Sequence, residues 1–295
     1  MNTTMPIQRS IARMITLPPP EPGFAGPGHT AVFVVDPKDF PTQDPFILLA
    51  DDRLELPDGA PVGDEHPHAG FEIATFVLEG ALRDRDEGVL RAGDVQWMTA
   101  GRGVIHGEHV VPEGRTRILQ LWLALPEAER WVEPRFETVT REAAPVRREP
   151  GIEAVVHSGS SGEWHAPAGQ HAPMALVDIR LGPGARLEQD LPASYTGFVY
   201  VLEGAARVGD GGAALRAGQV GWLDRPGGEG PSLLRLTGDS GGARLVLYAG
   251  QPVNAPIVMH GPFIGGTRAD IMRVSRDYIE GRFERMSALV GAARG

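Results

Sequence analysis

Two pairs of potential metal ligands stand in the N-terminal half of this 295-residue chain. His66 and His68 are separated by one residue, and so are His106 and Glu108. In an extended strand, residues two positions apart project from the same face. Two such pairs on neighbouring strands would direct three imidazoles and one carboxylate toward one point. The sequence therefore predicts a metal site formed by these four side chains.

This mixed nitrogen and oxygen donor set limits the choice of metal. It suits octahedral Fe(II), and also Mn, Co, Ni or Zn, with two coordination positions left open for water or substrate. A structural zinc site is more often closed, tetrahedral and rich in cysteine, and the chain contains no cysteine. The donor set therefore indicates an open metal site.

Local sequence around the two pairs favours strand ends. Pro67 cannot donate a hydrogen bond to a β-ladder, so it is expected at the start of a strand, at an edge or at a bulge. The turn at 100–103 contains two glycines and would let the backbone bend before His106. Both features are consistent with ligands at the mouth of a barrel.

Glu72 is a further possible ligand. It stands four residues after His68, beyond an expected kink at Gly70, so its facing is left open. A role in supporting the ligands or at the surface is expected instead. The other histidines are expected outside the site, in solvated loops (His29, His157, His165 and His171), at the surface (His109) or as a structural residue in a turn (His260).

The second half of the chain repeats the first. Residues 198–204 match 74–80, and residues 215–223 match 90–98. Both copies read as short strands separated by turn signals, which favours an all-β sandwich or barrel. A repeat of this length indicates two copies of one domain.

The two copies differ where the ligands stand. The same spacing places Asp190, Pro192 and Pro231 where the first copy has its histidines. The second domain is therefore expected to lack a ligand set. We place the domains at 1–135 and 136–295, the second ending in a helix over 268–280 that begins with a capping box at 267–270.

Composition excludes several classes of protein. The absence of cysteine excludes disulfides and thiolate catalysis and fits a reducing compartment. A net charge of −10 without a basic cluster argues against direct nucleic-acid binding. No apolar stretch is long enough to cross a membrane. We expect a cytoplasmic protein without membrane association.

Several stretches together resemble the pirin family of the cupin superfamily. They are His66–Glu72, Gly93–Glu108, Leu119–Leu123, Asp44–Leu49 and Pro256–Phe263. The resemblance implies two tandem cupin barrels, of the double-stranded β-helix or jelly-roll type, with a short C-terminal helix. It also implies iron in the N-terminal barrel alone.

The same resemblance implies a site and a function. It carries the metal ligands onto His66, His68, His106 and Glu108, so that Glu108 and not Glu72 is the acid. Fe(II) is the expected ion, with Mn, Co, Ni, Cu or Zn as alternatives. Pirin-like proteins are associated with quercetin 2,3-dioxygenase activity, which implies a flavonol or similar enolic substrate, with Glu108 as the catalytic proton acceptor.

Two other functions stay open. Pirin-like proteins are also implicated in binding transcription factors or metabolic enzymes, with the redox state of iron as a switch. The acidic net charge fits a protein partner better than DNA. A cupin isomerase acting on a polar metabolite is less consistent with the apolar strands. Cupins support many chemistries, so the fold by itself does not decide among these functions.

Overall fold

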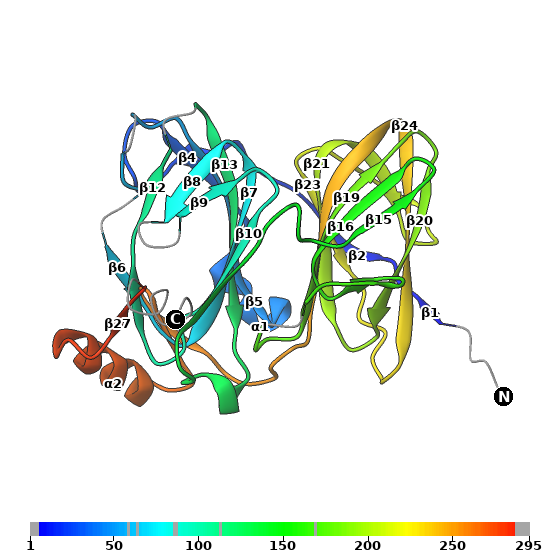
Figure 1. Ribbon diagram of the computed structural model, residues 1–295. Helices are drawn as coiled ribbons and strands as arrows, with labels where there is room; N and C mark the ends of the chain where they lie inside the picture. The colour runs from blue at the N-terminus through cyan, green and yellow to red at the C-terminus, as the bar shows by residue number, and fades with distance from the viewer. Residues whose placement is uncertain are drawn as a thin grey trace. The chain divides into compact units, whose positions relative to one another are not determined.

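A computed structural model describes residues 6–57, 60–62, 65–84, 88–111, 114–167 and 170–286. The chain forms two compact β-rich units, and Figure 1 shows their strands and the short helix near the C-terminus. The N-terminal barrel unit comprises residues 19–142, 169–172 and 253–295, and the C-terminal barrel unit comprises 1–18, 143–168 and 173–252. The predicted all-β architecture of two cupin domains with a C-terminal helix is confirmed.

The N-terminal barrel unit is built on a seven-stranded sheet. In spatial order its strands are β14 (Arg135–Val139), β10 (Val95–Thr99), β7 (Phe71–Glu79), β13 (Thr116–Ala124), β5 (Phe46–Leu54), β4 (His29–Val35) and β3 (Glu21–Pro22). Two three-stranded sheets complete it: β27 (Glu284–Arg285), β11 (Val104–His106) and β6 (His66–His68), and then β12 (Glu108–Val110), β8 (Ala81–Asp84) and β9 (Gly88–Arg91). Alternate residues along each strand fill the interior.

Two apolar layers fill the interior of this unit. The first joins Phe71 and Ile73 of β7 to Val104 of β11. The second joins Val77 of β7 to Val110 of β12. Strand β7 therefore contributes to both layers from one face, as alternation requires.

The C-terminal barrel unit contains a ten-stranded sheet. Its main path is β15 (Val146–Glu149), β16 (Ile152–Ser158), β19 (Met174–Leu181), β24 (Pro231–Gly250), β21 (Thr196–Val208), β23 (Gln219–Leu223) and β2 (Ile11–Thr16), joined by β1 (Ile7–Gln8), β20 (Arg186–Pro192) and β22 (Ala213–Arg216). Strands β17 (Ser160–Ser161) and β18 (Trp164–His165) form a separate pair. One continuous cluster of buried aliphatic side chains fills this unit.

The repeat found in the sequence is also a repeat of strand pairing. Val95 of β10 pairs with Phe76 of β7 in one unit, and Val220 of β23 pairs with Tyr200 of β21 in the other. These are the residues that the sequence repeat aligns with each other. The prediction of two copies of one domain is therefore confirmed at the level of register.

Each end of the chain packs with the barrel that is more distant in sequence. Residues 1–18 belong to the C-terminal barrel unit, and residues 253–295 belong to the N-terminal barrel unit. The predicted domains, 1–135 and 136–295, are each continuous in sequence. Each structural unit instead also contains a segment from the other end of the chain. The helix α2 (Arg268–Ile279) therefore packs on the N-terminal barrel unit.

Helix α2 begins as the sequence predicts. The Thr267 hydroxyl accepts a hydrogen bond from the Asp270 backbone N–H, and the Asp270 carboxylate accepts one from the Thr267 backbone N–H. This capping box satisfies two N–H groups at the helix start. Ile271 and Val274 are buried on one face. No helix among the described residues has the length and apolar composition to cross a bilayer.

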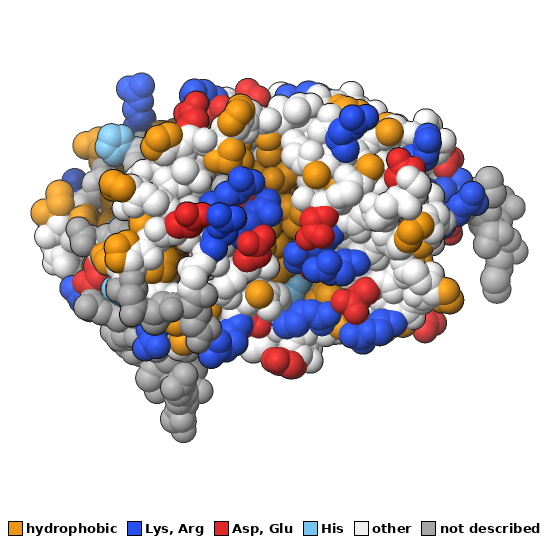
Figure 2. Space-filling model, turned by 90° about the horizontal axis from the view of Figure 1, so that it is seen from above, with side chains coloured by type: hydrophobic (Ala, Val, Ile, Leu, Met, Phe, Trp, Pro, Cys, Tyr) orange, Lys and Arg blue, Asp and Glu red, His pale blue; other side chains and the backbone are white. Residues whose placement is uncertain are grey.

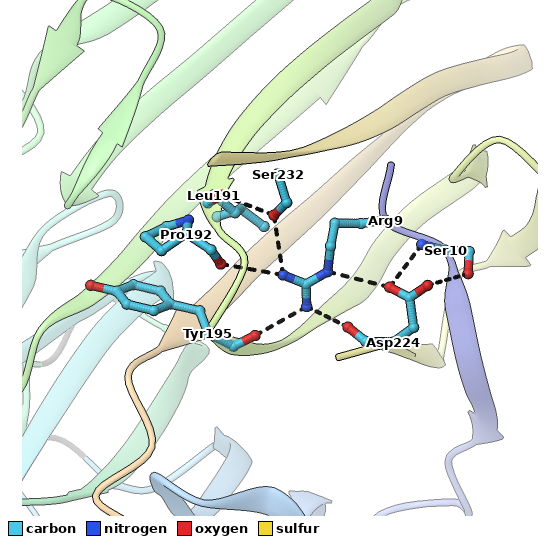
Figure 3. Close-up of polar contacts among 7 residues, drawn as sticks. All are labelled: Arg9, Ser10, Leu191, Pro192, Tyr195, Asp224 and Ser232. Atoms are coloured by element: carbon cyan, nitrogen blue, oxygen red, sulfur yellow. Dashed lines mark hydrogen bonds and ion pairs between the residues drawn. The ribbon is translucent and has the colours of Figure 1, made fainter. Parts of the chain in front are cut away.

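The N-terminal segment is attached to its barrel by a buried arginine (Figure 3). Arg9 is 1% exposed. Its guanidinium donates hydrogen bonds to the backbone oxygens of Pro192, Tyr195 and Asp224, to the Ser232 hydroxyl and to the Asp224 carboxylate. Burial lowers the pKa of Arg9, and the Asp224 carboxylate opposes that shift. These partners compensate the cost of burying the charge.

We predict that Arg9→Met destabilises the C-terminal barrel unit by about 3 kcal/mol, because the substitution removes one partner of a buried ion pair. The Asp224 side chain is 34% exposed, so the loss is expected at the low end for buried pairs. The measurement is the urea unfolding midpoint. Arg13→Met, at an exposed position of the same segment, is the control. Equal stability of the two variants would contradict the prediction.

Candidate metal centre

Three imidazoles meet on two paired strands. Strands β6 and β11 are antiparallel, with His66 directly opposite His106 and His68 opposite Val104. The potential ligand atoms of the three histidines lie within 4.8 Å of one another. Within the described part of the chain, this is the one group of three or more metal-ligating side chains so placed. The structure therefore provides a group that could hold a metal ion.

Backbone geometry places these strands as the sequence predicts. Strand β6 is at the edge of its sheet, where Pro67 costs no ladder hydrogen bond. Gly101 and Gly103 adopt φ angles of +47° and +140° in the turn before β11. Side-chain-bearing residues rarely adopt these angles, so the two glycines direct the chain back toward β6.

The His68 imidazole is held in the form that binds metal. Burial lowers the pKa of His68 well below its usual value, and the neighbouring His106 and His66 lower it further, while the Pro262 carbonyl opposes the shift. A neutral imidazole is the ligand form. Protonation of His68 therefore offers little competition to a metal ion near neutral pH.

Glu108 is buried on the strand that follows His106. It is 3% exposed, and its backbone oxygen accepts a hydrogen bond from the Val62 N–H. The group defined by mutual distance contains the three histidines and does not include Glu108. Its role as the acidic ligand therefore stays a prediction.

Glu72 has a structural role on the other face of β7. It is 2% exposed, so a surface position is wrong. Its carboxylate accepts hydrogen bonds from the Thr99 hydroxyl at 2.7 Å and from the backbone N–H groups of His171 and Ala172 at 3.0 Å. Its neighbour Phe71 faces His68, with ring centroids 5.4 Å apart. Alternation along β7 therefore turns Glu72 away from the histidines and toward residues 170–172.

Two other histidines are buried where solvated loops are predicted. His29 is 2% exposed in β4, and its Nε2 lies 2.8 Å from Asp52 Oδ1. His157 is 1% exposed in β16. His171 is half-buried, with Nδ1 2.5 Å from Glu129 Oε2. The predictions for His29 and His157 are wrong, because both residues lie within strands and both are buried.

An aromatic wall borders the imidazole group, and sequence reasoning did not identify it. The Trp122 ring lies 5.3 Å from His68 and 4.4 Å from Phe71, measured between centroids. Trp122 alternates with buried leucines on β13 and projects from the interior face. The period-two pattern of 119–123 was the signal that could have indicated this wall.

In the C-terminal barrel unit, the residues that point inward differ from those that the sequence repeat aligns with the histidines. Strand β20 pairs with β24 so that Gln189 faces Leu234 and Leu191 faces Ser232. All four residues are buried. These side chains form no carboxylate or imidazole set.

The predicted equivalents are therefore displaced by one residue. Asp190 is half-buried, and Pro192 and Pro231 are exposed on the other face of the ladder. A one-residue slip exchanges the two faces of a strand, and loop lengths near β20 and β24 differ from those of the first copy. The expectation that this unit lacks a ligand set stays a prediction.

The C-terminal segment packs behind the imidazole strands. Ala69 and Phe263 form a parallel bridge, and the Ile264 N–H donates to the Ala69 carbonyl. Strand β27 pairs with β11 in parallel. Ile271 and Val274 of α2 join Ala69 and Phe263 in one apolar cluster. The segment thus supports both ligand strands, with β27 and α2 close to β6 in Figure 1.

Comparison with known proteins agrees with this arrangement. Residues 34–123 match the family model described as pirin, and residues 176–284 match the pirin C-terminal cupin domain. The chain is 34% identical over 248 residues to a pirin-like protein of Solanum lycopersicum, covering 82% of this chain and 83% of that one.

Two solved structures are similar over most of the chain. The structure of GK1651 from Geobacillus kaustophilus has a TM-score of 0.78 at 38% identity, covering 85% of this chain and 100% of that one. A quercetin 2,3-dioxygenase from Acinetobacter baumannii has a TM-score of 0.80 at 28% identity, covering 94% and 98%.

The two barrels and the imidazole group in the first of them define a two-domain cupin protein with a candidate metal centre. Within that class, the chain belongs to the pirin family.

We predict that Gly70→Ala disturbs the metal centre from outside it. A Cβ at Gly70 would lie 1.9 Å from the Ile264 backbone oxygen, and the φ angle is +90°. Gly26 has a similar φ of +88° with nothing within 4 Å, so Gly26→Ala should cost only the backbone strain, about 1–2 kcal/mol. Gly70→Ala should lower the unfolding midpoint further and weaken metal binding, as measured by thermal unfolding and metal titration. If the two variants behave alike, the C-terminal segment does not support the ligand strands.

Proposed function

We propose that this protein is a metal-dependent dioxygenase of the quercetin 2,3-dioxygenase type, acting on a flavonol or a similar enolic substrate. The observation that carries the proposal is the group of three close, largely buried imidazoles beside an aromatic wall. The similarity to a quercetin 2,3-dioxygenase over nearly the whole chain supports it. A cytoplasmic location remains a prediction.

The residues present fit a divalent transition metal. Three imidazoles form most of a mixed donor set, and His66, His68 and His106 would hold the ion with Glu108 as the acidic ligand. We propose Fe(II), with Mn, Co, Ni, Cu or Zn as alternatives. When bound, the ion would supply Lewis-acid polarisation and redox chemistry with O2.

The chain's own residues would position the substrate and move its proton. Phe71 and Trp122 offer flat apolar surfaces against which an aromatic ring can stack. Glu108 stands two residues after His106 on the chain, and it would accept the proton from the enolic hydroxyl.

Removal of one imidazole should abolish metal binding at the site. We expect His106→Ala to lower affinity for Fe(II) by about 100-fold or more, since even supporting residues commonly cost 10–100-fold. His109→Ala is the matched control, because His109 is a neighbouring histidine outside the three-histidine group. Elemental analysis and metal titration measure both variants. Full metal content in His106→Ala would place the ion elsewhere.

The reaction itself gives a direct test. The iron-loaded protein is expected to convert a flavonol and O2 to a depside and an equimolar amount of carbon monoxide. Glu108→Gln should lower kcat by about 10²–10⁴-fold if Glu108 moves the proton. Gas analysis of carbon monoxide, with metal content measured on the same samples, provides the readout. A metal-loaded wild-type protein that forms no carbon monoxide from any flavonol would contradict the proposal and favour the iron-dependent regulator.

A further inference from the structure

A row of polar side chains crosses the seven-stranded sheet of the N-terminal barrel unit. Gln96 of β10 pairs with Thr75 of β7, and Thr75 pairs with Gln120 of β13. Residues in one register row project from the same face of a sheet. Ile73 is two residues from Thr75 on that face and belongs to the apolar interior. The row Gln96–Thr75–Gln120 therefore projects into the barrel.

The row lies at the level of the candidate metal centre. On one side is the apolar layer that includes Ile73 of β7 and Val104 of β11. On the other side is the layer that includes Val77 of β7 and Val110 of β12. His106 and Glu108 alternate between Val104 and Val110 along the chain. Both walls of the barrel are thus polar at one level and apolar above and below it.

Gln96 is buried, and its amide nitrogen finds no hydrogen-bond partner among the described residues. It is 3% exposed, and its Nε2 has no hydrogen-bond partner there. The indole Nε1 of Trp122, two residues from Gln120 on the same face, also has none. Buried polar groups are nearly always hydrogen-bonded, so each such group calls for an occupant. Both atoms are donors, and an occupant must therefore present acceptor oxygens.

Several side chains on the interior face at this level are partly exposed. Gln120, Trp122 and His66 are each half-buried, although they project from the inner faces of their strands. The outward neighbours Leu119 and Leu121 on β13 are fully buried. On β13 the inward side chains are thus more exposed to solvent than the outward ones, so a ligand could reach them from solvent.

We propose that Gln96 is a substrate-positioning residue whose amide donates a hydrogen bond to an oxygen of the organic substrate, with the Trp122 indole N–H as a second donor. This inference rests on the proposed function and adds a requirement on the substrate. Besides the enolic oxygen at the metal centre, the substrate carries another acceptor oxygen on the part that faces β10 and β13. Flavonols with an oxygen substituent beyond the 3-hydroxy-4-keto unit, such as polyhydroxylated ones, meet this requirement.

The test compares ligand preference in wild type and in Gln96→Met, which keeps the side-chain length and removes the amide. The iron-loaded proteins are titrated without O2 against flavonols that share the 3-hydroxy-4-keto unit and each lack one other oxygen. In wild type, loss of the oxygen that faces Gln96 should weaken binding about tenfold, the value of one good hydrogen bond. In Gln96→Met, the same ligand change should alter binding by less than about twofold.

Gln189→Met is the matched control. Gln189 is also a fully buried inward glutamine, and it donates to the Ser160 and Asp190 carbonyls in the C-terminal barrel unit. Its loss should reduce stability there and leave the ligand preference of wild type intact. Equal metal content in all three proteins, checked by elemental analysis, ensures that the comparison concerns the ligand.

The outcomes separate this inference from the proposed function. An unchanged preference in Gln96→Met, or a wild-type protein that does not distinguish or does not bind the ligands, overturns the role of Gln96. Carbon monoxide formation tests the reaction independently. Selective binding that depends on Gln96 without any carbon monoxide would overturn the dioxygenase and leave the binding role in place.

Discussion

The register between β6 and β11 is the constraint on which the candidate site depends. Because His66 lies opposite His106, the two strands direct all three imidazoles to the same side of a short ladder. A slip of one residue would turn one pair outward and leave no group of three. Three-residue strands provide few hydrogen bonds to hold such a register, so neighbouring parts of the fold must hold it.

Those neighbouring parts come from the C-terminal end of the chain. The Asp44 carboxylate accepts hydrogen bonds from the Val253 and Asn254 N–H groups, both at 2.8 Å, where this segment enters the N-terminal barrel unit. The segment then pairs with Ala69 and, through β27, with β11. The ligand strands are thus held between the barrel and a segment that arrives from far along the sequence.

Sequence patterns of short range were sufficient for much of this picture. The two i, i+2 ligand pairs predicted convergence of four side chains, and the structure brings the three histidines among them together. The capping box predicted the start of α2. Long-range partners were not accessible in this way. Glu72 accepts hydrogen bonds from residues 171 and 172, and no local pattern contains that contact. The equivalents of the ligands in the second copy were displaced by one residue, because matching turns of unequal length does not determine which face of a strand is inward.

The two barrels differ in how much of the interior is apolar. In the C-terminal barrel unit, Leu191 and Leu234 at inward positions join a continuous aliphatic core. In the N-terminal barrel unit, the same kind of interior is divided into two apolar layers by a polar level on both walls. Each layer is smaller than the undivided core, and apolar burial is the main favourable term in folding.

Charged contacts around the N-terminal barrel compensate for this division of its apolar interior. Glu72 is fully engaged on the outer face of β7, Asp52 is paired with His29, and Asp51 forms a two-pronged ion pair with Arg117 at 2.8 and 2.7 Å. Such charge-assisted contacts fix strand positions where apolar packing is interrupted. On the face in Figure 2, basic and acidic side chains are likewise interspersed. The polar level of the barrel can therefore exist without apolar packing across it, because other contacts hold the strands that carry it.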